Sequence, residues 1–352
     1  MLTSFPNSSL DHKLKCTHQN TNRMYDSEQA SAWQLLDLSN YRQGAVPDQE
    51  ELARLSGILD PVNPLEVVTV FNPWVDHVAH TLQAAFAAER CVVIGMTGSV
   101  CSGKTTAARV LHYLFAQRYG QDKTTLLTLD HFLKPNALIQ SSDGGMESKG
   151  FPETFRFDDL LCALNSITRG QSIDIPTYDH ARYDICFDLI KHIPPNQKVL
   201  ILEGIIAAQD TPPWANVEHT EHRQHVRDFC DTLIFVKTPN DNAILPAWFE
   251  ERLLLFARTA RQLREGHLAV RYAEYIEQYD QDRAQGVDAY RADERFTQAI
   301  RQDAQRIWRE TNGPNYDQYI LPSKAHCDTI LLKNHNHHVA GVFARTGIAT
   351  DM

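Results

Sequence analysis

Short apolar runs alternate along this chain with longer stretches in which apolar residues recur every three or four positions. The short runs predict strands that are buried on both faces, because such strands have no polar side. These runs are residues 91–96, 125–129, 199–202, 232–236 and 329–332. Helical spacing between several of them favours an α/β fold with a doubly wound, mostly parallel sheet.

The two ends of the pattern differ from this alternation. Residues 1–24 are polar and predict a disordered N-terminal tail. Residues 25–88 predict a helical segment packed on the main domain, with a helix start at Asp48. We expect residues 89–352 to form the main domain. Within it, residues 253–309 read as a charged, helical lid with possible breaks at Gly266 and Gly286.

The segment between the first strand and the following helix fits the pattern G-x-x-x-x-G-K-[ST], which defines a phosphate-binding loop. Glycines let the backbone curl around phosphate groups, and the helix N-terminus offers free N–H groups. The lysine reaches the β- and γ-phosphates, and the hydroxyl after it binds Mg²⁺. The predicted nucleotide-binding residues here are Gly98, Ser99, Val100, Cys101, Ser102, Gly103, Lys104, Thr105 and Thr106. The alternative is a glycine-rich connection without a ligand.

Carboxylates directly follow the second and third predicted strands, as Asp130 and Glu203. Ligands of open α/β sheets bind beyond the carboxyl ends of the strands, so both side chains are candidates for the site. Asp130 could accept a proton from an attacking hydroxyl, and Glu203 could hold Mg²⁺. The alternative is that both acids only cap local turns or helices.

Composition narrows the class of protein further. A net charge of -10 over 352 residues argues against nucleic acid as the main partner. The seven cysteines are scattered and never occur as C-x-x-C, which favours reduced thiols and a cytoplasmic location. No apolar run approaches the roughly 20 residues that span a bilayer, so we expect no membrane partner.

Several blocks resemble the bacterial P-loop type of pantothenate kinase, a family related to uridine kinase and phosphoribulokinase. These blocks are residues 98–109, 130–136, 149–153, 176–184, 202–204, 308–312, 320–322 and 333–337. They follow the family's order and spacing over residues 30–345. The resemblance implies phosphorylation of pantothenate to 4′-phosphopantothenate, the first step of coenzyme A biosynthesis, with ATP as co-substrate and Mg²⁺ as cofactor.

The resemblance also assigns roles by position. It makes Asp130 the base, Lys104 and Arg252 the catalytic cations, and Thr105 and Glu203 the metal-site residues. It implies a pantothenate pocket, contacts near adenine, and a site for coenzyme A as feedback inhibitor. The pocket residues it implies are Tyr178, His180, Tyr183, Phe249 and Asn312. Those near adenine are Lys333 and His337, and those of the coenzyme A site are Arg109, His180 and Phe256. The family is homodimeric, so a homodimer is implied as well.

This chain departs from the family pattern at several positions. His131 follows the base where the family usually has glycine, and Phe249 stands where a pocket tyrosine is expected. The lid is roughly twenty residues longer than the family spacing. A related kinase acting on another small alcohol, or a non-catalytic nucleotide-binding homologue, therefore remains an alternative. A metal site at His335, His337 and His338 is a further one.

Overall fold

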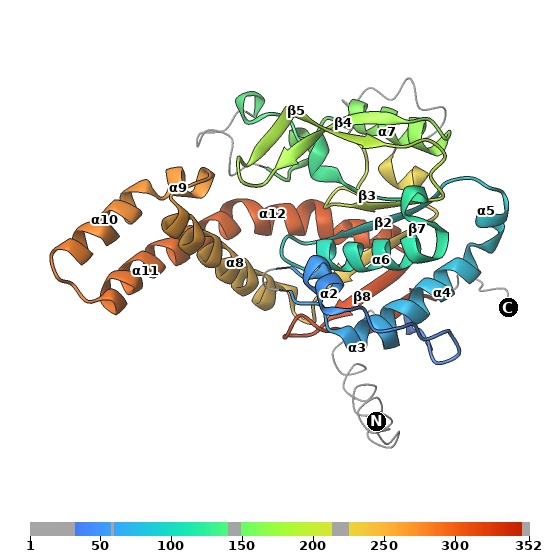
Figure 1. The fold of residues 1–352 in the computed structure, drawn as a ribbon, viewed down its shortest axis with the longest axis horizontal. Coiled ribbons are helices and arrows are strands. Elements are labelled where there is room, and N and C mark those ends of the chain that lie inside the picture. Colours follow the sequence, from blue (N-terminus) through green and yellow to red (C-terminus); the bar gives the residue numbers. More distant parts are fainter. Residues whose placement is uncertain (1–31, 58–59, 140–148, 213–224, 347–352) are drawn as a thin grey trace, which may run out of the picture.

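The computed structural model describes residues 32–57, 60–139, 149–212 and 225–346. The tail predicted for residues 1–24 lies outside them. A seven-stranded sheet with the order β1-β9-β8-β7-β2-β6-β3 forms the centre of the molecule (Figure 1). Helices cover both of its faces, and a helical arm projects from one side.

All the predicted strands lie in this sheet, in parallel pairs. Every residue of β2, β6 and β8 is buried, as the apolar runs required. The strands are β2 Val92–Gly98, β3 Thr124–Thr128, β6 Val199–Glu203, β7 Thr232–Lys237 and β8 Thr329–Lys333. The doubly wound, mostly parallel α/β fold is confirmed.

One edge of the sheet departs from the prediction. Strand β1 (Trp33–Leu35) lies in the segment that was expected to be helical, and that expectation is wrong for these residues. It pairs antiparallel with β9 (Val339–Arg345), which the sequence pattern had not indicated. A three-residue strand is too short to show a period, and its pairing with a distant strand decides its conformation.

Residues 49–55, 64–81 and 83–87 are helical and pack on one face of the sheet beside α6 (Lys104–Tyr119), whereas residues 36–48 contain no helix. Trp74, Phe115 and Ile94, from α4, α6 and β2, share one buried cluster there. Asp48 caps the first of these helices, because its side chain accepts a hydrogen bond from the N–H of Glu51. The elements are α2 Gln49–Leu55, α3 Pro64–Glu66, the π-helical η1 Val67–Phe71, α4 Asn72–Thr81 and α5 Gln83–Ala87.

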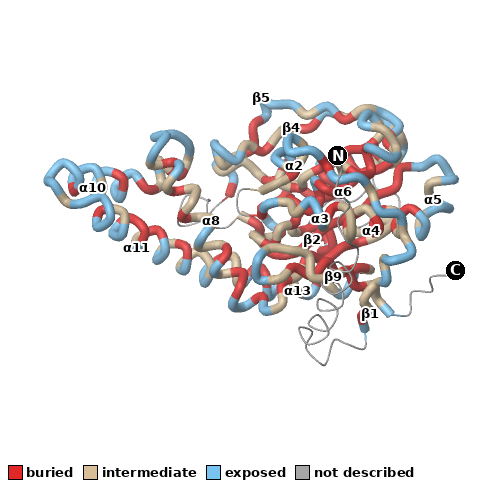
Figure 2. The backbone as a smooth tube through the Cα atoms, turned by 60° about the horizontal axis from the view of Figure 1, so that its bottom comes forward, coloured by how far each residue is buried: buried red, intermediate tan, exposed pale blue. Residues whose placement is uncertain are grey.

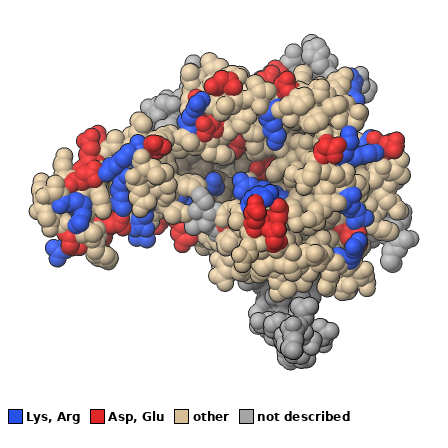
Figure 3. Space-filling model, in the orientation of Figure 1, with Lys and Arg blue, Asp and Glu red and all other residues tan. Residues whose placement is uncertain are grey.

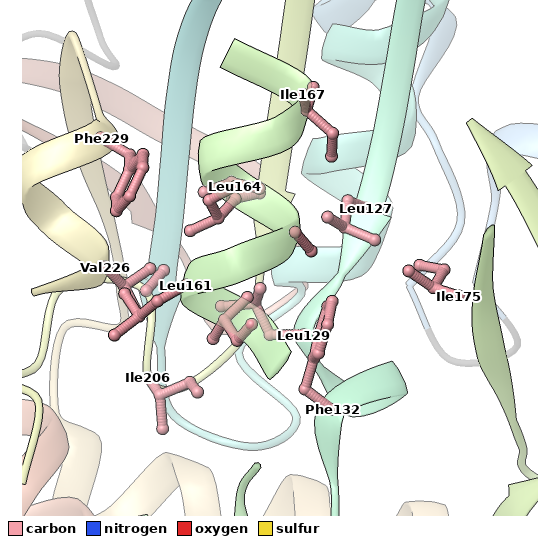
Figure 4. Close-up of a cluster of buried hydrophobic side chains, with 14 of the residues drawn as sticks. Leu127, Leu129, Phe132, Leu161, Leu164, Ile167, Ile175, Ile206, Val226 and Phe229 are labelled. Atoms are coloured by element: carbon pink, nitrogen blue, oxygen red, sulfur yellow. The ribbon is translucent and has the colours of Figure 1, made fainter. Parts of the chain in front are cut away.

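Helix α7 (Phe157–Thr168) covers the opposite face. Its Leu161 and Leu164 pack against Leu127 and Leu129 and complete a second buried cluster (Figure 4). Beside α7, at the top of Figure 1, lies a separate two-stranded antiparallel sheet, β4 (Ile173–Asp179) with β5 (Asp184–Ile193). This hairpin was not predicted as strands.

The arm consists of α8 (Asp241–Leu263), α9 (His267–Arg271), α10 (Ala273–Ala284) and α11 (Ala289–Ile307). Breaks occur at Gly266 and Gly286, as predicted, and both have a positive φ. The arm has a buried cluster of its own, and its outer surface is exposed (Figure 2). Its first helix begins twelve residues before the predicted lid, which was placed at residues 253–309.

Short elements connect the rest of the chain. After α11 the helix continues through π-helical turns, which lead back to β8. The π-helical turns are η7 Trp308–Asn312 and η8 Tyr316–Ile320, and the short α-helical turns α12 Gly313–Asn315 and α13 Leu321–Ser323 follow them. The 3₁₀ turns are η2 Gln121–Lys123, η3 Leu129–Phe132, η4 Asn136–Leu138, η5 Pro152–Thr154, η6 Val226–Phe229 and η9 Lys324–His326.

Candidate active site

The phosphate loop connects the end of β2 with the start of α6, and two of its positions require glycine. Gly98 has φ +142°, and a Cβ there would lie 2.5 Å from the carbonyl oxygen of Val236. Gly103 has φ +88°, and a Cβ there would lie 2.6 Å from the Asp60 carboxylate. The buried hydroxyls of Ser99 and Ser102 have no hydrogen-bond partner among the described residues. A ligand in the loop would supply the missing partners.

Lys104 begins α6 and is buried. Its Nζ donates a hydrogen bond to the carbonyl oxygen of Ser99 at 2.7 Å, which folds the side chain back over the loop. Burial lowers the pKa of Lys104, and the negative charges of Glu203 and Asp130 act in the opposite direction. The ammonium therefore faces both carboxylates that the sequence placed after the strands.

The two carboxylates meet because β3 and β6 are neighbours. Thr128 pairs with Glu203 in the sheet, and its Oγ1 donates to Glu203 Oε2 at 3.2 Å. Asp130 follows in η3, at the same edge. Burial raises the pKa of both acids, and the charge of Lys104 lowers it in each case. The predicted grouping of these side chains is what the structure shows, while their roles stay predictions.

Arg252 comes to the same place from the arm helix α8. Its Nη1 lies 3.7 Å from the Sγ of Cys101 in the phosphate loop, and its guanidinium lies 5.3 Å from the centre of the Phe256 ring. Its positive charge lowers the pKa of Asp130, after the larger effects of burial and Lys104. Arg252 thus faces the phosphate loop and the candidate base together.

The residues at this edge fit a Mg²⁺ ion. The Thr105 hydroxyl is near enough to Glu203 to lower the pKa of that carboxyl, so a hydroxyl and a carboxylate oxygen lie near one another. Mg²⁺ prefers such oxygens and usually takes one or two carboxylates plus substrate phosphates. In the described part of the chain, no three His, Cys, Asp or Glu side chains are grouped as metal ligands. The alternative of a histidine metal site at residues 335–338 thus finds no support there.

Three aromatic or imidazole side chains of the predicted pocket lie together on the β4–β5 hairpin. The Tyr178 ring lies 5.1 Å from the His180 ring and 6.2 Å from the Tyr183 ring, both edge-on. His267 of the arm stacks on Tyr183 at 4.4 Å. Burial lowers the pKa of His180, the charge of Arg252 lowers it as well and that of Glu203 raises it, so the hairpin turn lies close to both of these side chains.

Lys149 is a site residue to which the sequence gave no role, although it lies within one of the matching blocks. Its Nζ lies 4.2 Å from the Tyr183 ring centre and 4.9 Å from that of Tyr178. It also donates to the Tyr183 carbonyl oxygen. Burial lowers the pKa of Lys149 to about 8, against the opposing charges of Asp184 and Asp130. Only the family block pointed to it, because a lone lysine has no pattern of its own.

The residues predicted to lie near adenine, Lys333 and His337, are at the end of β8 and in the turn after it. Lys333 Nζ forms a buried ion pair with Asp60 Oδ1 at 3.1 Å. The His337 ring stacks on Trp248 at 3.7 Å. Its Nδ1 is buried and has no partner among the described residues. Asp60 and Trp248 were missed by the sequence reading.

The other predicted residues lie around this centre. Phe249 lies against Trp308 with ring centres 6.0 Å apart, and Asn312 follows in the same helical stretch. Arg109 is exposed on α6 and reaches the carbonyl oxygen of Ser56 at 3.5 Å. Phe256 lies under Arg252, one turn further along α8. The pocket and feedback roles of these residues stay predictions.

A hollow is visible in the space-filling view (Figure 3). It lies between the lobe that carries β4 and β5, the arm and the main body of the sheet, and basic and acidic side chains border it. No helix in the described ranges has both the length and the apolar character required to cross a membrane.

Comparisons with known proteins agree with this geometry. A model of the Phosphoribulokinase / Uridine kinase family matches residues 93–245. The pantothenate kinase of Sorangium cellulosum (strain So ce56) is 35% identical over 257 residues, which cover 73% of this chain and 73% of that protein. That of Vibrio vulnificus (strain YJ016) is 30% identical over 84% of this chain and 92% of that protein.

A third pantothenate kinase, from Pectobacterium carotovorum subsp. carotovorum (strain PC1), is 29% identical over 92% of this chain and 100% of its own length. The fold and the site thus define a P-loop kinase of the phosphoribulokinase and uridine kinase class. Within that class, the chain belongs to the pantothenate kinase family.

Proposed function

We propose that this chain transfers the γ-phosphoryl group of ATP to the primary hydroxyl of pantothenate, giving 4′-phosphopantothenate and ADP. The observation that carries the proposal is the grouping of Asp130 and Glu203 around Lys104, with Arg252 facing them from the arm. Phosphoryl transfer needs positioning, positive charge and a group that orients or deprotonates the acceptor, and this grouping supplies all three.

In this proposal Asp130 accepts the proton of the pantothenate hydroxyl while its oxygen attacks the γ-phosphorus. The bond between the γ-phosphorus and the bridging oxygen breaks, and ADP leaves with that oxygen. Lys104 and Arg252 stabilise the charge on the transferred group and on the leaving phosphate. Both cations are held close to Asp130 before substrate binds, so little rearrangement is needed.

Mg²⁺ belongs to the proposal because the oxygen atoms of Thr105 and Glu203 fit it. When bound, the ion would neutralise negative charge on the β- and γ-phosphates. Thr105 and Glu203 would hold it, and Thr128 would keep the Glu203 carboxylate oriented through its hydrogen bond.

The acceptor side of the proposal rests on the hairpin. Tyr178, Tyr183, His180 and Lys149 lie together and provide two hydroxyls, an imidazole and an ammonium group. Pantothenate has hydroxyls, an amide and a carboxylate that can bind such groups. We include in the same proposal a homodimer, feedback by coenzyme A through Arg109, His180 and Phe256, and a cytoplasmic location, where ATP is available.

A second acceptor is favoured by one observation. Phe249 offers no hydroxyl where the family's pocket has a tyrosine, and it packs against Trp308 instead. A kinase for another small alcohol would keep the residues that transfer the phosphoryl group and would differ at Phe249 and in the arm.

The test is ADP release by the purified protein with Mg²⁺ and ATP, comparing pantothenate, pantetheine, uridine and glycerate. We expect turnover on pantothenate, and a fall in kcat of about a hundredfold or more in Asp130→Asn, with ATP binding kept. Turnover on a different alcohol would replace the substrate and keep the mechanism. Wild-type turnover by Asp130→Asn would remove Asp130 as the base.

A further inference from the structure

His131 occupies the position directly after the candidate base and is buried in a turn that the family usually builds with glycine. Its Nδ1 accepts a hydrogen bond from the backbone N–H of Tyr178 at 3.0 Å. The ring therefore joins the turn that carries Asp130 to the strand that carries a predicted pocket residue. These two segments are 47 positions apart in the sequence.

The strand needs this bond because β4 has β5 on one side only. The ladder between them shifts register between Pro176 and Thr177, immediately before Tyr178. A buried N–H without a partner is costly, and the His131 ring supplies the acceptor. The turn is also held from its other side, where Arg156 Nη2 donates to the carbonyl oxygen of His131 at 2.9 Å.

The imidazole itself is a poor candidate for a second base. An Nδ1 that accepts from a backbone N–H belongs to the neutral ring with its proton on Nε2. Burial, together with the positive charges of Lys191 and His180, lowers the pKa of His131 to about 4. The ring thus stays neutral in ordinary buffers, and its lone pair is already engaged.

We propose that His131 is a positioning residue, which fixes the base Asp130 relative to the pocket residue Tyr178 by accepting the Tyr178 N–H. The inference rests on the proposed function for its kinetic consequences only. Loss of the acceptor would let the hairpin shift against the turn, so the hydroxyl of the acceptor substrate would meet Asp130 less often in a reactive geometry. ATP binding would be unaffected, because the phosphate loop is not part of this link.

Two substitutions separate this role from general packing. His131→Leu keeps the volume and removes the acceptor, whereas His131→Asn places an amide oxygen on the γ-carbon, close to where Nδ1 lies. His112→Leu is the matched control, since the His112 ring of α6 bonds the backbone carbonyl oxygen of Thr124 in β3. The readouts are hydrogen–deuterium exchange of the Tyr178 amide, steady-state kinetics for both substrates, and Tm.

We expect His131→Leu to exchange the Tyr178 amide faster and to lose about ten- to a hundredfold in kcat/KM for pantothenate, with KM for ATP nearly unchanged. His131→Asn should restore most of both properties. His112→Leu should lower Tm without changing either KM. Unchanged Tyr178 exchange in His131→Leu, or equal losses in the leucine and asparagine variants, would overturn the proposal. A wild-type protein inactive on pantothenate would refute the proposed function alone, because the exchange data still decide the His131 link.

Discussion

The buried ion pair between Asp60 and Lys333 joins the N-terminal segment to the end of strand β8, beside Gly103 of the phosphate loop. The side chains are 11% and 4% exposed, and Nζ lies 3.1 Å from Oδ1. The second carboxylate oxygen lies against Gly103, where an added Cβ would be 2.6 Å away. Asp60→Ala would therefore leave a buried ammonium unpaired and remove the group that packs against the phosphate loop.

The magnitude follows from the burial of both partners. Removing one partner of a buried pair costs about 3–5 kcal/mol of unfolding free energy, because the remaining charge stays desolvated. Asp60 Oδ2 has no hydrogen-bond partner among the described residues, so the pair is incompletely compensated and the lower value, about 3 kcal/mol, applies. The double variant Asp60→Leu with Lys333→Met leaves no charge behind and should lie within about 1 kcal/mol of wild type.

Urea unfolding would measure these free energies, and titration with ATP would measure the effect on the loop. Asp76→Ala is the matched control, because Asp76 pairs with Arg118 at 2.6 Å with both side chains partly exposed, and its loss should cost at most about 1 kcal/mol. We expect weaker ATP binding in Asp60→Ala and not in Asp76→Ala. An Asp60→Ala protein as stable as the Asp76→Ala protein, with wild-type ATP affinity, would refute the reasoning.

Three further predictions concern the charges at the site. Lys149→Met should move the acid limb of the kcat/KM profile to higher pH, because the positive charge of Lys149 lowers the pKa of Asp130. Lys149→Arg keeps the charge and should leave the limb in place. Identical pH profiles for the two variants would show that Lys149 does not affect the pKa of the base. Asp130→Asn should raise Tm at pH 8 and lose this advantage as pH falls. The folded pKa of Asp130 lies above its usual value, so its stabilising contribution is present at low pH and is lost as pH rises through the folded pKa. Alkylation of Cys101, which lies in the phosphate loop beside Arg252, should inactivate the enzyme unless ATP is present; inactivation that ATP does not slow, or that persists in Cys101→Ala, would contradict this.

Local patterns were enough to predict the central strands and the phosphate loop. Five apolar runs became parallel strands, because continuous burial on both faces leaves a clear mark in the sequence. The β4–β5 hairpin left no such mark, since much of β5 is exposed and still includes Phe187 and Ile190. Strand β1 is too short to show a period at all.

In the candidate site, too, only residues marked by a local sequence pattern could be predicted. Asp130 and Glu203 could be predicted because each follows a strand, and the ends of parallel strands meet at one edge. Asp60 could not, since its partner Lys333 lies 273 positions away and no local pattern marks either member of the pair. The role of His131 is hidden for the same reason, because its ring bonds a backbone N–H that any residue could offer.

The long arm can affect the site because one helix belongs to both. Helix α8 carries Arg252 at the site, and further along it Arg258 and Arg261 pair with Asp293 of α11 at 2.6 and 2.8 Å. Some of the charged side chains of this segment therefore join its helices, which also share a buried apolar cluster. A helix of 23 residues is about 35 Å long and bends little over two turns. A change in the packing of the arm would thus displace Arg252. The extra length of the lid could therefore change which acceptor substrate is phosphorylated, even if every residue that contacts the substrate stays the same.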